Sequence, residues 1–156
     1  MTHDEFVAHI RSRFPHLFDP ATSEQEWQYL ITIGPGWHAL VEEYCVKAEA
    51  VLREHGEVGS WYIRQIKEKL GELRIYHRPA PYERLDGFLE TVNDIDPPHP
   101  TPVQELLSDL RGQIIERAHR TCEECGEPGG LRVIDGWYRT CCDKHLQEWQ
   151  DRKAKR

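Results

Sequence analysis

The sequence lacks several features that would each assign a chain to a class of protein. No apolar run approaches the roughly 18 residues that a membrane-spanning helix needs. No basic and then apolar segment opens the chain, so a secretory leader is not expected. Internal repeats and low-complexity segments are also absent. From these absences we expect a globular protein of the cytoplasm with no membrane partner.

Positive charge is scarce over most of the chain. The 156 residues include 20 Lys and Arg against 27 Asp and Glu, which gives a net charge of −7. Residues 1–110 hold 10 basic and 19 acidic residues, whereas residues 111–156 hold 10 and 8. Binding to nucleic acid needs basic side chains opposite the phosphates, so the acidic first part disfavours it. The dense basic run at 152–156 is either a helix end that complements the helix dipole or part of a basic interface.

Cysteine is sparse, and its spacing is more informative than its number. Five is an odd number, and a chain of this length can bury a core without covalent cross-links, so a disulfide framework is not favoured. Cys122 and Cys125 have two residues between them and are followed by Gly126, and Cys142 and His145 repeat the spacing. Two such pairs around a hairpin-sized insert are typical of tetrahedral zinc sites. We therefore predict one structural zinc ion, bound by Cys122, Cys125, Cys142 and His145.

The residues between and after these pairs indicate the local structure of the module. Asp135-Gly136 between two β-prone runs predicts a hairpin over 131–140. The segment 143–149 has the pattern of a helix, which puts Cys142 and His145 on one face of its first turn. A turn with two cysteines, a hairpin and a helix start occur in this order in treble-clef zinc fingers.

Two alternatives to this ligand set remain open in the sequence. Cys141 with His145 would also reach around one helical turn, although we favour Cys142 and expect Cys141 to be a small buried side chain. His119 lies one turn before Cys122 and is either an alternative ligand, a hydrogen-bonding partner of one, or a solvated helix residue, which is the favoured interpretation.

The first part of the chain reads as three helices. Capping-box patterns at Thr2 and Ser23 predict helices up to Pro15 and through Ile31. Gly34-Pro35-Gly36 then breaks the chain, and a long helix is expected over 37–55. Cys45 lies on the apolar stripe of that helix among acidic neighbours, so we expect an inert buried thiol.

Two β-strands and two more helices are predicted next. The alternation over 61–67 and 73–77 around a glycine favours a β-hairpin, with a helix through Lys69 as the competing interpretation. A short helix is expected over 82–92 and a stiff proline-rich connector over 96–102. The helix that Thr101 caps should run into Cys122 with one apolar face, formed by Leu106, Leu107, Leu110, Ile114 and Ala118.

The fold class that follows is α+β. We expect a helical N-terminal body with a β-hairpin over residues 1–100. Residues 101–156 should form a helix and a treble-clef-like zinc module, packed onto the body as one compact unit.

Three blocks of the sequence resemble one group of proteins. They are Gly36-Trp37, the run from Gln65 to Tyr76, and the segment from Thr121 to His145 with its C-x2-C-G, G-W and C-D-x-H motifs. This pattern resembles small uncharacterised bacterial and prophage proteins over roughly residues 34–145. The resemblance implies the same four zinc ligands, leaves Cys141 outside the set, and implies no activity.

A binding role is favoured over an enzymatic one. A site that is filled by four protein ligands has no open position, and the hairpin lacks the His or Asn of an HNH-type nuclease. We expect a non-enzymatic protein-binding regulator or inhibitor of phage or prophage type, for example of a host nucleic-acid-binding defence complex, whose acidic body docks on a basic surface. Trp137, Tyr138 and Arg139 are candidate anchors, although Trp137 could instead pack near Trp149.

The competing function is nucleic-acid binding through the basic C-terminal module. The side chains that would contact phosphates are Arg132, Arg139, Lys144, Arg152, Lys153, Lys155 and Arg156.

Overall fold

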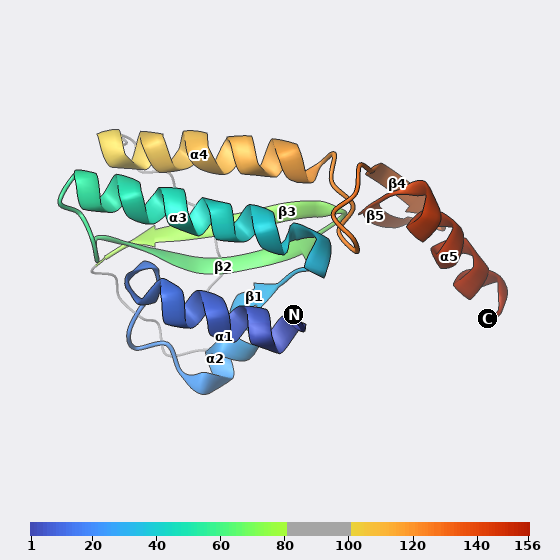
Figure 1. The fold of residues 1–156 in the computed structure, drawn as a ribbon, viewed down its shortest axis with the longest axis horizontal. Coiled ribbons are helices and arrows are strands. Elements are labelled where there is room, and N and C mark those ends of the chain that lie inside the picture. The colour runs from blue at the N-terminus through green and yellow to red at the C-terminus, as the bar shows by residue number, and fades with distance from the viewer. Residues whose placement is uncertain (81–100) are drawn as a thin grey trace.

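A computed structural model describes residues 1–80 and 101–156 and shows an α+β protein (Figure 1). The helix predicted over 82–92 and most of the proline-rich connector lie outside the described residues. Within the described part, no helix combines the length and the apolar composition needed to cross a membrane.

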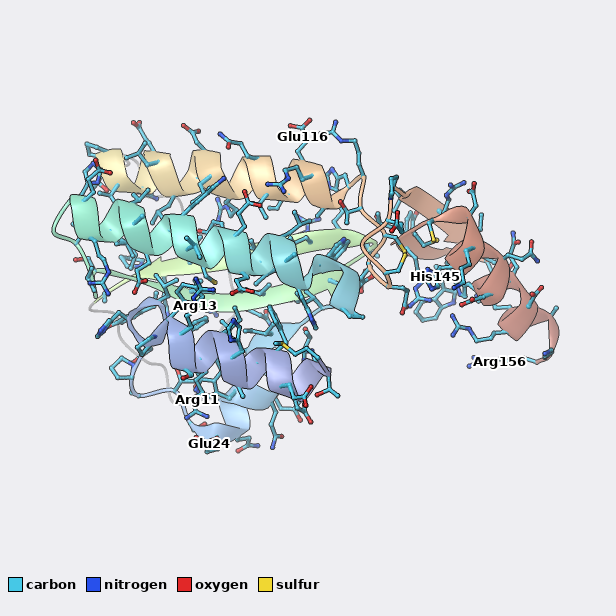
Figure 2. The ribbon with its side chains drawn as sticks, viewed as in Figure 1. Arg11, Arg13, Glu24, Glu116, His145 and Arg156 are labelled. Atoms are coloured by element: carbon cyan, nitrogen blue, oxygen red, sulfur yellow. The ribbon has the colours of Figure 1, made fainter. Side chains whose placement is uncertain are left out.

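The first two helices begin where their capping residues predict. Helix α1 (His3–Arg13) follows Thr2 and α2 (Glu24–Leu30) follows Ser23, and both N-termini form complete capping boxes. Arg11 of α1 donates to Glu24 of α2 at 2.9 Å, which ties the two helices together (Figure 2).

Helix α2 ends one residue earlier than predicted, at a strand that the sequence analysis missed. Strand β1 (Ile31–Thr32) pairs in parallel with β2 (Trp61–Lys69), with Ile31 opposite Ile66. Ile31 is completely buried, and β-branched residues suit an extended backbone in a sheet. A two-residue strand has no periodicity, so its partner strand, far along the chain, is what defines it.

The long central helix was predicted correctly. The short 3-10 helices η1 (Pro15–Leu17) and η2 (Pro35–Trp37) precede and follow α2, and α3 (His38–Glu54) comes next. Cys45 is completely buried on α3, and burial raises the pKa of its thiol far above the usual value, with Glu42 and Glu49 adding to the shift. The prediction that Cys45 is buried in the core is confirmed.

The β-hairpin is confirmed and the competing helix is wrong. Strands β2 (Trp61–Lys69) and β3 (Glu72–Pro79) pair antiparallel around a two-residue turn, Leu70-Gly71. Both turn residues have positive φ, 55° and 80°, which is the geometry of a tight hairpin turn. The chain therefore turns back at Leu70-Gly71 and does not continue as a helix, although Ile63, Ile66 and Leu70 fit a helical period.

Helix α4 (Pro102–Ala118) packs beside α3, and the two helices cover one face of the sheet (Figure 1). Arg117 on α4 forms an ion pair of 2.7 Å with Glu43 on α3. Leu106 was predicted to be buried, but it is 42% exposed, so that part of the prediction is wrong. Adjacent helical residues differ by about 100° in direction, and the buried stripe passes through Leu107 instead of Leu106. It consists of Val103, Leu107, Leu110, Ile114 and Ala118.

The remaining elements form a small module at one end of the body (Figure 1). Strands β4 (Gly130–Ile134) and β5 (Trp137–Cys141) form a second, two-stranded sheet, and α5 (Asp143–Ala154) follows directly. The predicted hairpin and helix are confirmed. The division of the chain into a body over residues 1–100 and a helix with a zinc module over residues 101–156 stays a prediction.

The module contacts the body through two backbone turns. We call residues 121–127 the cysteine turn and residues 34–37 the docking loop. The amide of Gly36 donates to the carbonyl of Glu123 at 2.6 Å, and the indole of the fully buried Trp37 donates to the carbonyl of Thr121 at 2.8 Å. On the other side, the Thr140 hydroxyl donates to the carbonyl of Gly71 at 2.6 Å.

Gly36 is where the docking loop comes closest to the cysteine turn. A Cβ atom at this position would lie 2.0 Å from the carbonyl oxygen of Cys122 and 2.5 Å from the amide nitrogen of Gly126. Both are backbone atoms, so neither can rotate away. Only glycine permits this contact.

We predict that Gly36→Ala lowers the free energy of unfolding by about 1–3 kcal/mol, the usual cost of overpacking. Gly112→Ala is the matched control, because Gly112 lies within α4 with nothing within 4 Å of the added methyl group. That change should raise stability by about 0.5–1 kcal/mol, since alanine favours the helix. Denaturant unfolding of both variants measures the difference, and a Gly36→Ala protein as stable as the parent would contradict the packing argument.

Candidate metal centre

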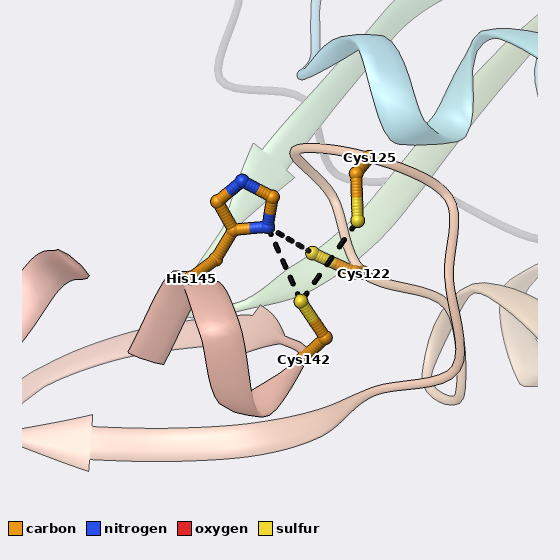
Figure 3. A group of neighbouring side chains, drawn as sticks. All are labelled: Cys122, Cys125, Cys142 and His145. Carbon is orange, nitrogen blue, oxygen red and sulfur yellow. Dashed lines mark hydrogen bonds between the residues drawn. The ribbon is translucent and has the colours of Figure 1, made fainter. Parts of the chain in front are cut away.

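The structure brings the four predicted ligands together (Figure 3). Cys122 and Cys125 lie in the cysteine turn between α4 and β4, Cys142 is the N-cap of α5, and His145 lies in the first turn of that helix. The Nδ1 atom of His145 is 3.5 Å from the sulfur of Cys122 and 3.2 Å from that of Cys142. The sulfurs of Cys125 and Cys142 are 3.8 Å apart.

These separations suit one tetrahedral metal ion. All four donor atoms lie within 4.8 Å of one another. Zinc–sulfur bonds of about 2.3 Å at tetrahedral angles would place two sulfurs about 3.8 Å apart. The group can therefore hold one metal ion, and three thiolates with one imidazole form a donor set that zinc prefers.

The cysteine turn is shaped by its own backbone hydrogen bonds. The amide of Cys122 donates to the carbonyl of Glu127 at 2.7 Å, and the amide of Gly126 donates to the carbonyl of Cys122 at 2.8 Å. Gly126 has a φ of 80°, a conformation that glycine adopts without strain. This turn aims the sulfurs of Cys122 and Cys125 at one point.

The surroundings of Cys122 and His145 suit metal binding. Burial opposes ionisation of the Cys122 thiol, but the backbone amides of Cys142, Cys125 and Glu124 donate to it, and the net effect lowers its pKa. The Nε2 atom of His145 lies 3.7 Å from the Glu148 carboxylate. A carboxylate on this side orients an imidazole whose other nitrogen binds a metal.

The two alternative ligands lie outside the group. Cys141 is 3% exposed, and burial together with the neighbouring Cys122 raises its pKa, as suits a buried thiol. His119 is the C-cap of α4, with its Nε2 atom 3.7 Å from Glu72 and its side chain nearly half exposed. Cys142 therefore belongs to the group, as predicted, and Cys141 packs inside.

Glu123 is a residue of this region that the sequence analysis missed. Its side chain accepts a hydrogen bond from the amide of Gly34 at 3.0 Å, and its backbone carbonyl accepts one from the amide of Gly36. Burial raises the pKa of its carboxyl group to about 7, even though the bond from Gly34 acts in the opposite direction. A glutamate between two cysteines has no local pattern that reveals a partner 89 residues away.

The three candidate anchor residues have different environments. Trp137 is 68% exposed, and its ring has Lys153 Nζ at 5.7 Å from its centroid. Tyr138 is also exposed. The Arg139 side chain instead interacts with other residues of the chain: its guanidinium pairs with Glu124 at 2.7 Å and lies over the ring of Trp149. Their role in binding a partner stays a prediction.

We predict that Cys142→Ser weakens zinc binding by more than about 100-fold, because even the hydrogen-bonding partners of metal ligands cost about 10–100-fold when mutated. Cys141→Ser is the matched control at the adjacent position and should retain one zinc ion per chain. Competition with a chromophoric chelator measures both affinities. The reverse result, with zinc lost from Cys141→Ser and kept by Cys142→Ser, would move the ligand to Cys141.

Comparison with known proteins identifies no relative of this chain. No family model, no curated protein and no solved structure matches this chain.

Proposed function

We propose that this chain is a non-enzymatic binding protein whose C-terminal module is a treble-clef-like zinc finger and whose partner is another protein. The observation that carries the proposal is the convergence of four protein ligands on one point. Four such ligands complete the tetrahedral coordination of zinc, which then has no open position for a substrate or an activated water. The zinc ion would serve to hold the fold together.

The order of elements around the site supports the treble-clef interpretation. The cysteine turn, the β4–β5 hairpin and the start of α5 follow one another, with two ligands at each end of the series. Apart from its contacts with the body, the module has a two-stranded sheet and one helix with a single buried residue, Trp149. A unit with so little apolar core needs the metal for stability.

Charge and exposed aromatic residues support a protein partner. The acidic body, with nine more acidic than basic residues over 1–110, would dock on a basic surface of a larger complex. Exposed Trp137 and Tyr138 on the module would supply apolar contacts of the kind enriched in protein interfaces. In this proposal the protein acts as a regulator or inhibitor that occludes such a surface, in the cytoplasm and in the manner expected of a phage or prophage protein.

Nucleic-acid binding through the module is the weaker candidate. Three of the seven basic residues that would serve it are ion-paired within the chain: Arg132 with Asp143 at 2.9 Å, Arg139 with Glu124 at 2.7 Å, and Lys153 with Asp135 at 3.7 Å. A cation with a neighbouring carboxylate contributes less to phosphate binding. The basic run at 152–156 ends at Arg156, at the end of α5 that is distant from the body (Figure 2).

We predict that the zinc-loaded protein gives no mobility shift with DNA or RNA at low salt. This should hold at protein concentrations up to about 10⁻⁴ M, which corresponds to the weak end of non-specific dissociation constants. We also predict that the tagged protein retains a partner protein from its native cell lysate after nuclease treatment. Trp137→Ala with Tyr138→Ala should lose this partner, whereas Tyr29→Ala, which removes an exposed aromatic ring from α2, should keep it. Salt-dependent binding to nucleic acid, with no retained protein, would contradict the proposal.

A further inference from the structure

Exposed apolar side chains concentrate at the β4–β5 hairpin and the turn beside it. Leu131, Val133 and Tyr138 are 52%, 54% and 41% exposed, and Leu70 in the adjacent β2–β3 turn is 59% exposed. We call Leu131, Val133 and Tyr138 the edge strip. A small, compact chain gains nothing in stability from leaving such side chains in water, and clusters of them mark interaction sites.

The edge strip lies on one face of the hairpin. Val133 is opposite Tyr138 and Leu131 is opposite Thr140, so these four side chains point the same way. Thr140 is buried against the body through its bond to Gly71, whereas the other three remain in solvent. The apolar face therefore begins at the body and continues outward without a covering element among the described residues.

Strand β4 also has a free backbone edge. The turn residues Asp135 and Gly136 have φ of 51° and 79°, so this is a two-residue hairpin in which Ile134 and Trp137 form a hydrogen-bonded pair. Because such pairs alternate along an antiparallel ladder, Val133 and Leu131 point their amides and carbonyls away from β5. No backbone hydrogen bond outside the ladder reaches either residue in the described part of the chain.

The opposite edge shows that this alternation holds. Thr140 belongs to the same class of ladder position as Val133 and Leu131, and its carbonyl points outward, where it accepts the amide of Glu123 at 3.0 Å. The outer edge of β5 is therefore occupied by the cysteine turn. Among the described residues, no such backbone partner reaches the outer edge of β4 at Leu131 or Val133.

The charge around this edge selects the partner. Residues 130–156 contain seven basic and four acidic residues, a net charge of +3, in a chain whose total is −7. Arg132 lies between Leu131 and Val133 and points to the other face of β4. A second copy paired antiparallel through Leu131 and Val133 would place Arg132 directly against its own counterpart, which is unfavourable. An acidic strand would place a carboxylate there instead, and that carboxylate would share the Arg132 guanidinium with Asp143, which pairs with it at 2.9 Å.

We propose that the free edge of β4 is a docking site for an extended acidic segment of another protein, which adds to the hairpin as a third strand. Main-chain hydrogen bonds to Leu131 and Val133 would provide the attachment. Apolar residues of the segment would cover the edge strip, and its acidic residues would alternate with them toward Arg132. This inference rests on the proposed function only in taking a protein as the partner.

The test uses the zinc-loaded full chain and a fluorescein-labelled octapeptide of alternating Glu and Val, followed by fluorescence anisotropy. Val133→Pro removes the outward amide without removing a ladder bond to β5, and Val133→Glu places a negative charge on the edge strip. Each should weaken binding by about tenfold or more, the effect of losing about 1.4 kcal/mol. Val46→Glu makes the same charge change at an exposed position of α3 and should leave binding within about twofold. Zinc content and circular dichroism confirm that each variant is folded.

Three results would overturn the proposal. One is equal weakening by Val133→Glu and Val46→Glu, and another is equal binding of a peptide of alternating Lys and Val. The third is a dimer of the protein alone in sedimentation that Val133→Pro abolishes, which would assign the edge to a second copy. If the proline variant still retains the nuclease-resistant partner from lysate, the edge proposal fails while the proposed function stands.

Discussion

The contact between the cysteine turn and the docking loop is the constraint on which the arrangement of this protein depends. The same few backbone atoms serve two purposes there. The turn that aims Cys122 and Cys125 at a metal also presents the carbonyls of Thr121 and Glu123 to Trp37 and Gly36. A change in the shape of the turn would therefore alter both the ligand geometry and the attachment of the module to the body. Gly36 is needed because any side chain would separate the two backbones.

This coupling would give a bound metal ion a role beyond the small module. Docking of the turn fixes the residues that lead into α3, and α3 forms the centre of the core together with α4 and the sheet. The module, with a net charge of +3 over residues 130–156, in turn presents a partly apolar hairpin at one end of an acidic body. A protein with opposite charge on its two parts can align a partner by electrostatics and hold it through apolar contacts.

The features that were predicted from the sequence are those with local causes. The capping boxes at Thr2 and Ser23 set the starts of two helices, and the Asp135-Gly136 turn produced the hairpin. The ligand pairs were predicted because zinc coordination requires short, regular spacings. Cys142 was preferred over Cys141 because the second ligand pair then begins at the helix and Cys141 points from the strand end into the core.

The features that escaped prediction depend on contacts between distant parts of the chain. Strand β1 exists because Ile31 meets Ile66. Leu106 and Leu107 are adjacent residues of the same type, and the packing of α4 against α3 and β3 decides which of them is buried. The role of Glu123 depends on Gly34. The sequence of the docking loop indicated only a break between two helices. Such pairings follow from the tertiary fold and leave no periodic pattern in the sequence.

The most direct test of this account is amide hydrogen exchange of the full chain before and after removal of zinc by a chelator. Structural zinc contributes on the order of 10–16 kcal/mol to small modules, so its loss should release the cysteine turn. The account predicts that protection of the Gly36 amide and of residues 121–127 falls by at least about tenfold on zinc removal, because the Gly36 amide bonds to that turn. Unchanged protection at Gly36 in fully metal-free protein would contradict the central claim.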